Sequence, residues 1–195
     1  MPGHSSDAIP APPVQSIWTI GHSTRTWEEF LGLLATQGIE AIVDVRRFPG
    51  SRRHPWFASE AMAAQLPAAG LHYHWLPQLG GRRNPVAGSP NGAWRNVAFQ
   101  GYADHLRSAE FAEGLGLALE SAQARPTALM CAEAVWWRCH RRLISDLLVH
   151  RGVDVIHILG PGQLQHHVLH PEARPDGGLL VYPPVQAGLF GDVPD

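Results

Sequence analysis

Apolar and polar positions change their period repeatedly along the chain. Short apolar runs near 16–23, 41–46, 71–76, 127–132 and 153–159 predict five strands. Between them, apolar residues recur at helical spacing over 27–37, 59–69, 99–124 and 138–151. Strands that alternate with helices are typical of an α/β domain with a parallel sheet. The pattern therefore predicts a single Rossmann-like α/β domain, with a mostly parallel sheet of about five strands flanked by helices.

Local signals predict where several elements begin and end. Thr26 precedes a helical pattern with acidic residues in its first turn, so it is the expected N-cap. Ser59 is the N-cap expected for the next helix. Residues 80–96 contain too much Gly, Pro and Asn for regular structure, which predicts a long loop. The pattern weakens after the fifth strand, and 178–182 is expected to be a last strand or an extended arm.

The two ends differ in composition from the rest of the chain. Residues 1–16 are rich in Pro, Ala and Ser and are expected to form a flexible arm, followed by the α/β domain over 17–182 and a flexible tail over 183–195. The start lacks the basic and apolar segments of a secretory signal, and no run of 18 apolar residues occurs. A cytoplasmic location is therefore expected. Two cysteines in that compartment argue against a structural disulfide.

Charge is distributed unevenly, although the net charge is only −2. The chain has no lysine, and the stretch between positions 41 and 100 contains seven arginines but only two acidic residues. Guanidinium groups pair bidentately with phosphate, so this region is compatible with a nucleic-acid or nucleotide-phosphate partner. A solvated surface with scattered ion pairs explains the charge alone equally well.

Reactive side chains gather where the predicted strands end, and ligands of open parallel sheets bind beyond those ends. In chain order, the residues at these strand ends and at the start of the helix after the fourth strand are His22, Ser23, Asp44, Arg46, Gly80, Gly81, Arg82, Cys131, Glu133, Cys139, His140 and Arg141. Each has a structural explanation when taken singly, because strand-end histidines are commonly hydrogen-bonded within a fold and free cysteines are commonly buried. Their coincidence on one edge favours a functional site.

The segment CAEAVWWRCHR (131–141) allows a thiolate interpretation and a metal interpretation. Cys139 is expected in the first turn of a helix beside arginines, which favours a thiolate, with His140 as its acid or base. Alternatively, Cys131, Cys139 and His140 supply soft ligands to a metal ion, and His22 or His157 completes a tetrahedron. The spacing C-x7-C-H is uncommon for zinc.

A third interpretation of this segment is an anion cradle. Backbone amides after the fourth strand and at the helix N-terminus would bind an anion together with the Arg141 fork. The phosphate loop of cysteine phosphatases and rhodaneses needs an arginine six residues after its cysteine, and Trp137 occupies that position here. Phosphatase chemistry is therefore not expected.

The C-terminal tail contains the peptide Gln186-Ala187-Gly188-Leu189-Phe190 after a Pro-Pro spacer. The pattern Q-x-x-L-F is similar to the short peptide by which bacterial DNA polymerases and repair proteins dock on the sliding clamp. Leu189 and Phe190 would supply apolar anchors and Gln186 a polar one. Docking on the bacterial clamp is the hypothesis, and a tail that covers its own domain or is disordered is the alternative.

Four motifs, TIGHS, DVRRFPGSRR, LGGRR and CAEAVWWRCHR, resemble the bacterial DUF488 family in their order and separation, over roughly residues 17–160. The resemblance implies an α/β fold and groups the motifs. It implies no reaction, because the family has no established activity. It highlights His22, Ser23, Asp44, Arg46, Pro49, Ser51, Arg52, Gly80, Gly81, Cys131, Glu133, Cys139, His140 and Arg141.

Together these patterns predict an enzyme or processing factor that acts on nucleic acid, in association with DNA repair. The anion-binding candidates are Arg46, Ser51, Arg52, Arg82 and Arg141. The catalytic candidates are Cys131, Glu133, Cys139, His140, His22 and Asp44, the last of which would orient an arginine or a ligand. Whether a metal ion is bound stays open. The alternatives are an enzyme on a small phosphorylated or sulfur-containing metabolite and a non-catalytic binding module with inert cysteines.

Overall fold

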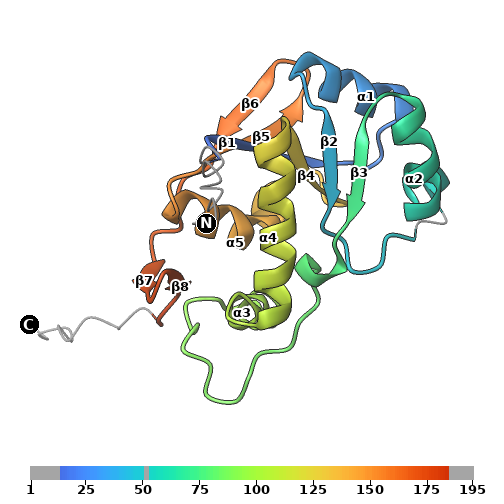
Figure 1. Cartoon of the computed structure of the whole chain (residues 1–195). Helices are drawn as coiled ribbons and strands as arrows, with labels where there is room; N and C mark the ends of the chain where they lie inside the picture. The colour runs from blue at the N-terminus through green and yellow to red at the C-terminus, as the bar shows by residue number, and fades with distance from the viewer. Residues whose placement is uncertain (1–13, 51–52, 185–195) are drawn as a thin grey trace, which may run out of the picture.

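A six-stranded sheet forms the centre of the domain (Figure 1). The computed structural model of the chain describes residues 14–50 and 53–184. The strand order is β3-β2-β4-β1-β5-β6. The parallel strands are β1 (Ser16–Gly21), β2 (Ala41–Asp44), β3 (His72–Trp75), β4 (Thr127–Cys131) and β5 (Asp154–Gly160), and β6 (Gln163–His166) pairs antiparallel with β5. The predicted α/β fold is confirmed, and all five predicted strands are present.

Three short strands were not predicted from the pattern, or were predicted only in part. β6 is exposed along its whole length, so it shows no apolar alternation. β7 (Arg174–Asp176) and β8 (Leu179–Val181) form a separate antiparallel hairpin. The residues between them, Gly177 and Gly178, have φ of 58° and 78°, a backbone conformation that glycine adopts without steric cost. The segment 178–182 is therefore a strand, but it does not join the main sheet.

Five α-helices are described, and they cover the two faces of the sheet. Apolar side chains of α1 (Trp27–Thr36) and α2 (Ser59–Ala68) pack in one cluster with Ile20 and Ile42. Side chains of α3 (Val97–His105), α4 (Ala109–Ala124) and α5 (Arg141–His150) pack in a second cluster with Ile17 and Val43. In Figure 1, α4 crosses in front of the sheet. Because β2 and β4 lie between these layers, both are buried along their whole length.

One predicted helix boundary is confirmed by the structure, and others were wrong. Thr26 caps α1 through a capping box with Glu29, as predicted for an N-cap. The prediction for Ser59 was wrong, since Ala58 occupies the cap position and Ser59 is already helical. The predicted helix over 99–124 is two helices, because α3 ends at His105 and Ser108 caps the start of α4.

The start of α5 differs from the prediction in a way that affects the candidate site. Residues Trp136–Arg138 form a short 3-10 helix, η3, and the backbone of Cys139 is extended. The α-helix begins only at Arg141, with His140 at its N-cap position. The prediction that Cys139 lies in the first helical turn was therefore wrong. The electrostatic environment of its thiol is set by neighbouring side chains and not by the dipole of a helix that contains it.

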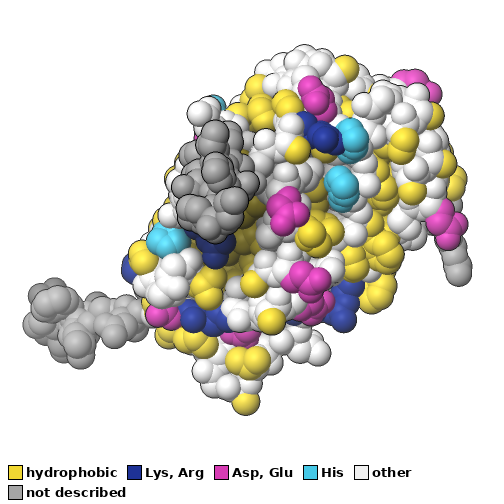
Figure 2. All heavy atoms as spheres, viewed as in Figure 1, with side chains coloured by type: hydrophobic (Ala, Val, Ile, Leu, Met, Phe, Trp, Pro, Cys, Tyr) yellow, Lys and Arg dark blue, Asp and Glu magenta, His cyan; other side chains and the backbone are white. Residues whose placement is uncertain are grey.

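The surface gives little further indication of a partner. On the face seen in Figure 2, acidic and basic side chains are interspersed without a patch of one sign. Over the described residues, no helix combines the length and the apolar character that crossing a bilayer requires.

Candidate functional site

The carboxyl ends of β1, β2 and β4 lie side by side, because β4 pairs with both of the other strands. A cavity of about 410 Å³ opens at this edge. Five segments contribute to its lining, namely 46–50, 81–82, 98–99, 131–133 and 138–140. The strand-end motifs that are far apart in the sequence therefore meet around one cavity, where ligands of open parallel sheets bind.

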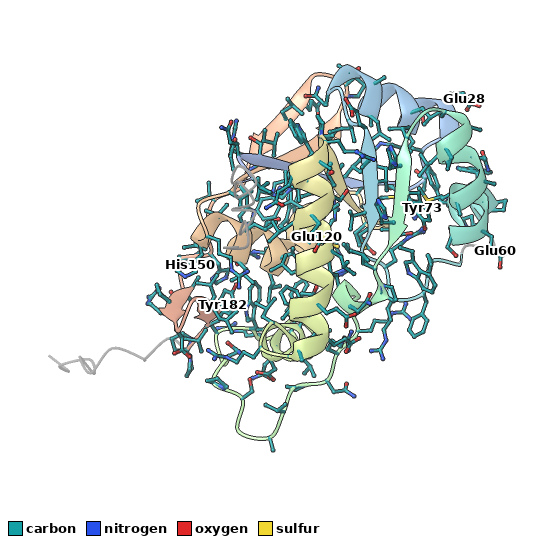
Figure 3. All side chains as sticks on the ribbon, viewed as in Figure 1. Glu28, Glu60, Tyr73, Glu120, His150 and Tyr182 are labelled. Carbon is teal, nitrogen blue, oxygen red and sulfur yellow. The ribbon has the colours of Figure 1, made fainter. Side chains whose placement is uncertain are left out.

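Arg46 is held at the cavity by a buried carboxylate. Its Nε lies 2.8 Å from Asp44 Oδ1 and its second terminal nitrogen 2.5 Å from Asp44 Oδ2, so the pair is bidentate. Tyr73, labelled on β3 in Figure 3, donates its hydroxyl to Asp44 Oδ2 over 2.8 Å. Asp44 is fully buried and is not among the cavity-lining residues. Its geometry is that of a group that orients Arg46 rather than one that touches a ligand.

His22 is the second partner of Arg46. Its Nδ1 donates to the Ser23 carbonyl over 3.0 Å, which leaves Nε2 as the acceptor for Arg46 at 3.1 Å. Burial, followed by the charge of Arg46, lowers the pKa of His22 to about 4. The ring stacks on Phe57 with centroids 4.3 Å apart and does not line the cavity. His22 is therefore a neutral support for Arg46, outside the cavity.

The glycines of the LGGRR motif let a loop approach the site closely. A Cβ at Gly80 would lie 2.5 Å from Cβ of Arg47, and a Cβ at Gly81 would lie 2.8 Å from Nδ1 of His140. Both contacts are too close for a side chain, so the sequence needs glycine at the two positions. Arg82 follows with φ of 61° and lines the cavity.

Cys131, Cys139 and His140 form a compact cluster on the cavity wall, defined here as the Cys-Cys-His cluster. Their two sulfurs and a ring nitrogen lie within 4.8 Å of one another. Both cysteines are free and largely buried. His140 Nε2 lies 2.9 Å from the carbonyl oxygen of Val45, which can only accept, so Nε2 carries the proton and Nδ1 faces the sulfur of Cys139 at 3.7 Å.

The two thiols have opposite acidities because they share a hydrogen bond. That bond and burial raise the pKa of Cys131 well above its usual range. Burial also opposes ionisation of Cys139, but the Cys131 thiol, His140 and Arg141 outweigh it and hold the pKa of Cys139 well below its usual range. Cys139 is therefore the more acidic thiol of the pair.

Arg141 is not a cavity residue, contrary to its predicted role as an anion-binding fork. Its side chain is almost fully buried, and its donors reach protein atoms: the Glu133 carbonyl, Cys139 Sγ at 3.5 Å and Thr19 Oγ1 at 3.3 Å. With its donors occupied in this way, the guanidinium holds the segment 131–141 together.

The Arg141 contact continues into a buried polar chain behind the site. The hydroxyl of Thr19 donates to His157, whose other nitrogen lies 2.9 Å from His167, and His167 lies 2.8 Å from Asp146. Burial, and then the neighbouring His167, lower the pKa of His157 to about 2. Because His157 and His22 both have other partners, neither completes a tetrahedron with the Cys-Cys-His cluster as the sequence had suggested.

Glu133 lines the cavity with an exposed side chain directly after β4. A Cβ at Gly21 would lie 1.8 Å from the Glu133 carbonyl oxygen. The end of β1 must therefore be glycine for the segment after β4 to turn into this position. Among the acidic residues predicted for the site, Glu133 alone is placed where it can meet a ligand within the described chain.

Several cavity residues were not among the predicted ones. Arg47 and Arg138 are exposed and line the cavity, as does the exposed ring of Phe48. Arg47 follows Arg46 and Arg138 precedes Cys139 in motifs that the sequence analysis had already singled out. Those neighbouring positions were the sequence signal that could have identified both arginines. Tyr73 was missed because nothing in a strand sequence shows which neighbour its hydroxyl meets. Of the predicted residues, Ser51, Arg52, Gln186, Leu189 and Phe190 lie outside the described part of the chain.

Comparison with known protein families matches residues 26–148 to the domain of unknown function DUF488. The chain belongs to the DUF488 family. The matched range contains the arginine segment after β2, the LGGRR loop and the Cys-Cys-His cluster, so these features of the cavity lie within the DUF488 domain. No curated protein and no solved structure matches the chain.

Proposed function

We propose that this DUF488 protein is a nucleic-acid-processing protein that binds a phosphate group of its substrate in the cavity, next to the Cys-Cys-His cluster. The observation that carries the proposal is the placement of four arginines, Arg46, Arg47, Arg82 and Arg138, in one cavity with three reactive side chains. Arginine forks are suited to phosphate oxygens. The proposal therefore assigns binding to the arginines and chemistry to the cluster.

The pairing of the arginines supports an external anion. Within the described residues, Arg47, Arg82 and Arg138 form no ion pair with an acidic side chain. By contrast, Arg83, which follows Arg82, is paired bidentately with Glu110. Exposed cationic groups that converge on a cavity and are not paired with a carboxylate raise the local concentration of anions.

An aromatic ring beside these arginines favours nucleic acid over other phosphorylated ligands. Phe48 is 68% exposed, and the Arg47 guanidinium lies 5.7 Å from its ring centroid. Bases of single strands stack on such rings, and the arginines follow the phosphate backbone. In this proposal Glu133 is the acid or base that meets the substrate, while Asp44 and His22 keep Arg46 in place.

Binding of labelled single-stranded, duplex and damaged oligonucleotides at increasing salt tests the proposal. We expect affinity to fall with salt, and the double variant Arg47→Ala and Arg82→Ala to bind weakly with a salt slope smaller by about two. Arg151→Ala is the matched control, because Arg151 is exposed at the end of α5, away from the cavity. If no oligonucleotide binds at low salt, the nucleic-acid proposal is refuted.

An enzyme on a small phosphorylated or sulfur-containing metabolite is the second candidate. A cavity of about 410 Å³ is within the usual range for small-molecule sites, which favours this alternative. It predicts that inorganic phosphate or a mononucleotide binds as well as an oligonucleotide does. A non-catalytic module predicts instead that neither Cys131 nor Cys139 reacts with an alkylating reagent in the folded protein.

We propose the bacterial sliding clamp as the protein partner. The two proteins would meet in the cytoplasm, during DNA repair. The proposal rests on the tail peptide Gln186–Phe190, outside the described residues. A pull-down with the clamp tests it, with Leu189→Ala plus Phe190→Ala as the variant. If the clamp retains the parent chain and the variant equally well, the proposal that this tail docks on the clamp is refuted. The proposed role of the cavity does not depend on that result.

A further inference from the structure

The spacing of the Cys-Cys-His cluster is close to that of a metal site. Tetrahedral zinc with sulfur and nitrogen ligands separates its ligand atoms by roughly 3.5 to 3.8 Å, given the usual bond lengths. The two sulfurs and the ring nitrogen lie within 4.8 Å of one another, and His140 Nδ1 lies 3.7 Å from Cys139 Sγ. Small side-chain movements therefore suffice to bring all three atoms into coordination distance.

His140 has the orientation of a metal-binding histidine. Metal-bound histidines donate their other ring N–H to a carbonyl or carboxylate, which fixes the ring and the tautomer. His140 does this, because Nε2 donates to the Val45 carbonyl over 2.9 Å. Its Nδ1 is left as a lone pair on the side of the sulfurs, and Gly81 leaves the space beside that nitrogen free of a side chain.

The sulfurs are also supported from behind. Arg141 donates its Nε–H to Cys139 Sγ, and the backbone N–H of Glu133 donates to Cys131. Donors of this kind orient thiolate ligands in metal sites. Two thiolates and a neutral imidazole neutralise a divalent cation, so the bound ion would add no net charge beside the cavity arginines.

We propose that Cys131, Cys139 and His140 bind one Zn²⁺ ion through three protein ligands, with the fourth coordination position open to the cavity. Two thiolates and one imidazole suit zinc, whereas iron–sulfur clusters held only by cysteines need four and the chain contains two. The described residues supply no fourth His, Cys, Asp or Glu to the group. Three protein ligands and an open position are typical of catalytic rather than structural zinc.

The proposed ion gives the phosphate-binding cavity a reactive centre. Its open position would take water or a substrate oxygen, beside the arginines that bind the phosphate and within the same cavity as Glu133. This role rests on the proposed function, whereas the binding of zinc itself does not. Thiol protons that remain on the cysteines pass to the buffer when the ion binds.

Zinc and cobalt titrations of the reduced, chelator-treated full-length chain test the site. We expect one ion per chain by elemental analysis, and a near-ultraviolet thiolate-to-cobalt band with the visible bands of tetrahedral Co²⁺. Cys131→Ser, Cys139→Ser and His140→Gln should each weaken zinc binding on the order of 100-fold or more. His72→Gln is the control, since His72 is exposed on β3 and lies outside the cluster, and it should bind as the parent does.

Circular dichroism of each metal-free variant separates loss of the site from loss of the fold, and the cobalt spectrum of the unmodified chain decides the question even if one variant fails to fold. No binding at micromolar zinc, or a cobalt band that His140→Gln leaves unchanged, would overturn the site. So would rapid formation of a Cys131–Cys139 disulfide that zinc does not prevent. Oligonucleotide binding is measured separately on metal-free and zinc-loaded protein, so that its failure counts against the proposed function and not against the metal site.

Discussion

Asp44 should contribute more to stability than any exposed carboxylate, because it is the acidic residue that pairs with the buried charge of Arg46 among the described residues. Asp44 is 0% exposed and Arg46 is 6% exposed. Burial lowers the pKa of Arg46, but the hydrogen bonds and charge of Asp44 outweigh it and raise that pKa, so the guanidinium stays charged. Asp44→Asn keeps the size of the side chain but leaves this charge without its counter-ion. Breaking a buried pair in this way costs about 3–5 kcal/mol.

Urea unfolding followed by tryptophan fluorescence measures the loss in the free energy of unfolding. The slope of that free energy against urea concentration should be the same for the variant and the parent. The matched control is Asp154→Asn, because Asp154 pairs with His166 on the surface and should lose less than about 1 kcal/mol. Asp44→Asn combined with Arg46→Met should be less destabilising than the two single changes together, since the double variant leaves no charge unpaired. If Asp44→Asn costs no more than Asp154→Asn, the assignment of Asp44 as the counter-ion of a buried charge is wrong.

Three further outcomes follow from the structure. His22 and His157 have pKa values lowered to about 4 and about 2, so the unfolded chain binds more protons below pH 6.5 and stability is lost as the pH falls below that value. Each histidine contributes at most about 1.4 kcal/mol per pH unit, and His22→Asn should reduce the loss of urea stability between pH 6 and 5 by about 1.2 kcal/mol; an unchanged slope would contradict the lowered pKa. Gly21→Ala should destabilise the protein by more than about 2 kcal/mol, because its methyl group meets a backbone oxygen at 1.8 Å, whereas Gly32→Ala, with nothing within 4 Å, should be neutral or stabilising in thermal unfolding. Arg141→Lys loses the fork that joins three segments and should cost about 2–4 kcal/mol by urea unfolding, and a loss under about 0.5 kcal/mol would show that these hydrogen bonds do not stabilise the segment.

The fold was largely predictable because its signals are local. Strands that are buried on both faces, such as β2 and β4, must be apolar along their whole length, and a capping residue such as Thr26 acts on its own helix. β6 escaped prediction because an exposed edge strand needs no apolar pattern. The start of α5 was misplaced because the tertiary contacts of Arg141 and His140, rather than helix propensity, set the conformation of Cys139.

The sequence by itself determined that reactive groups collect at one sheet edge, because the carboxyl ends of parallel strands meet there wherever the strands pair. It did not determine which of these groups face the cavity. That depends on the strand order, which places β4 between β1 and β2, and on side-chain partners far apart in the chain. Asp44, His22 and Arg141 have their polar atoms engaged by protein groups and became supports, whereas Arg47 and Arg138 have no carboxylate partner among the described residues and face the cavity. Only the tertiary structure decides this division, because hydrogen-bond satisfaction in a buried site is a property of the neighbours and not of the residue.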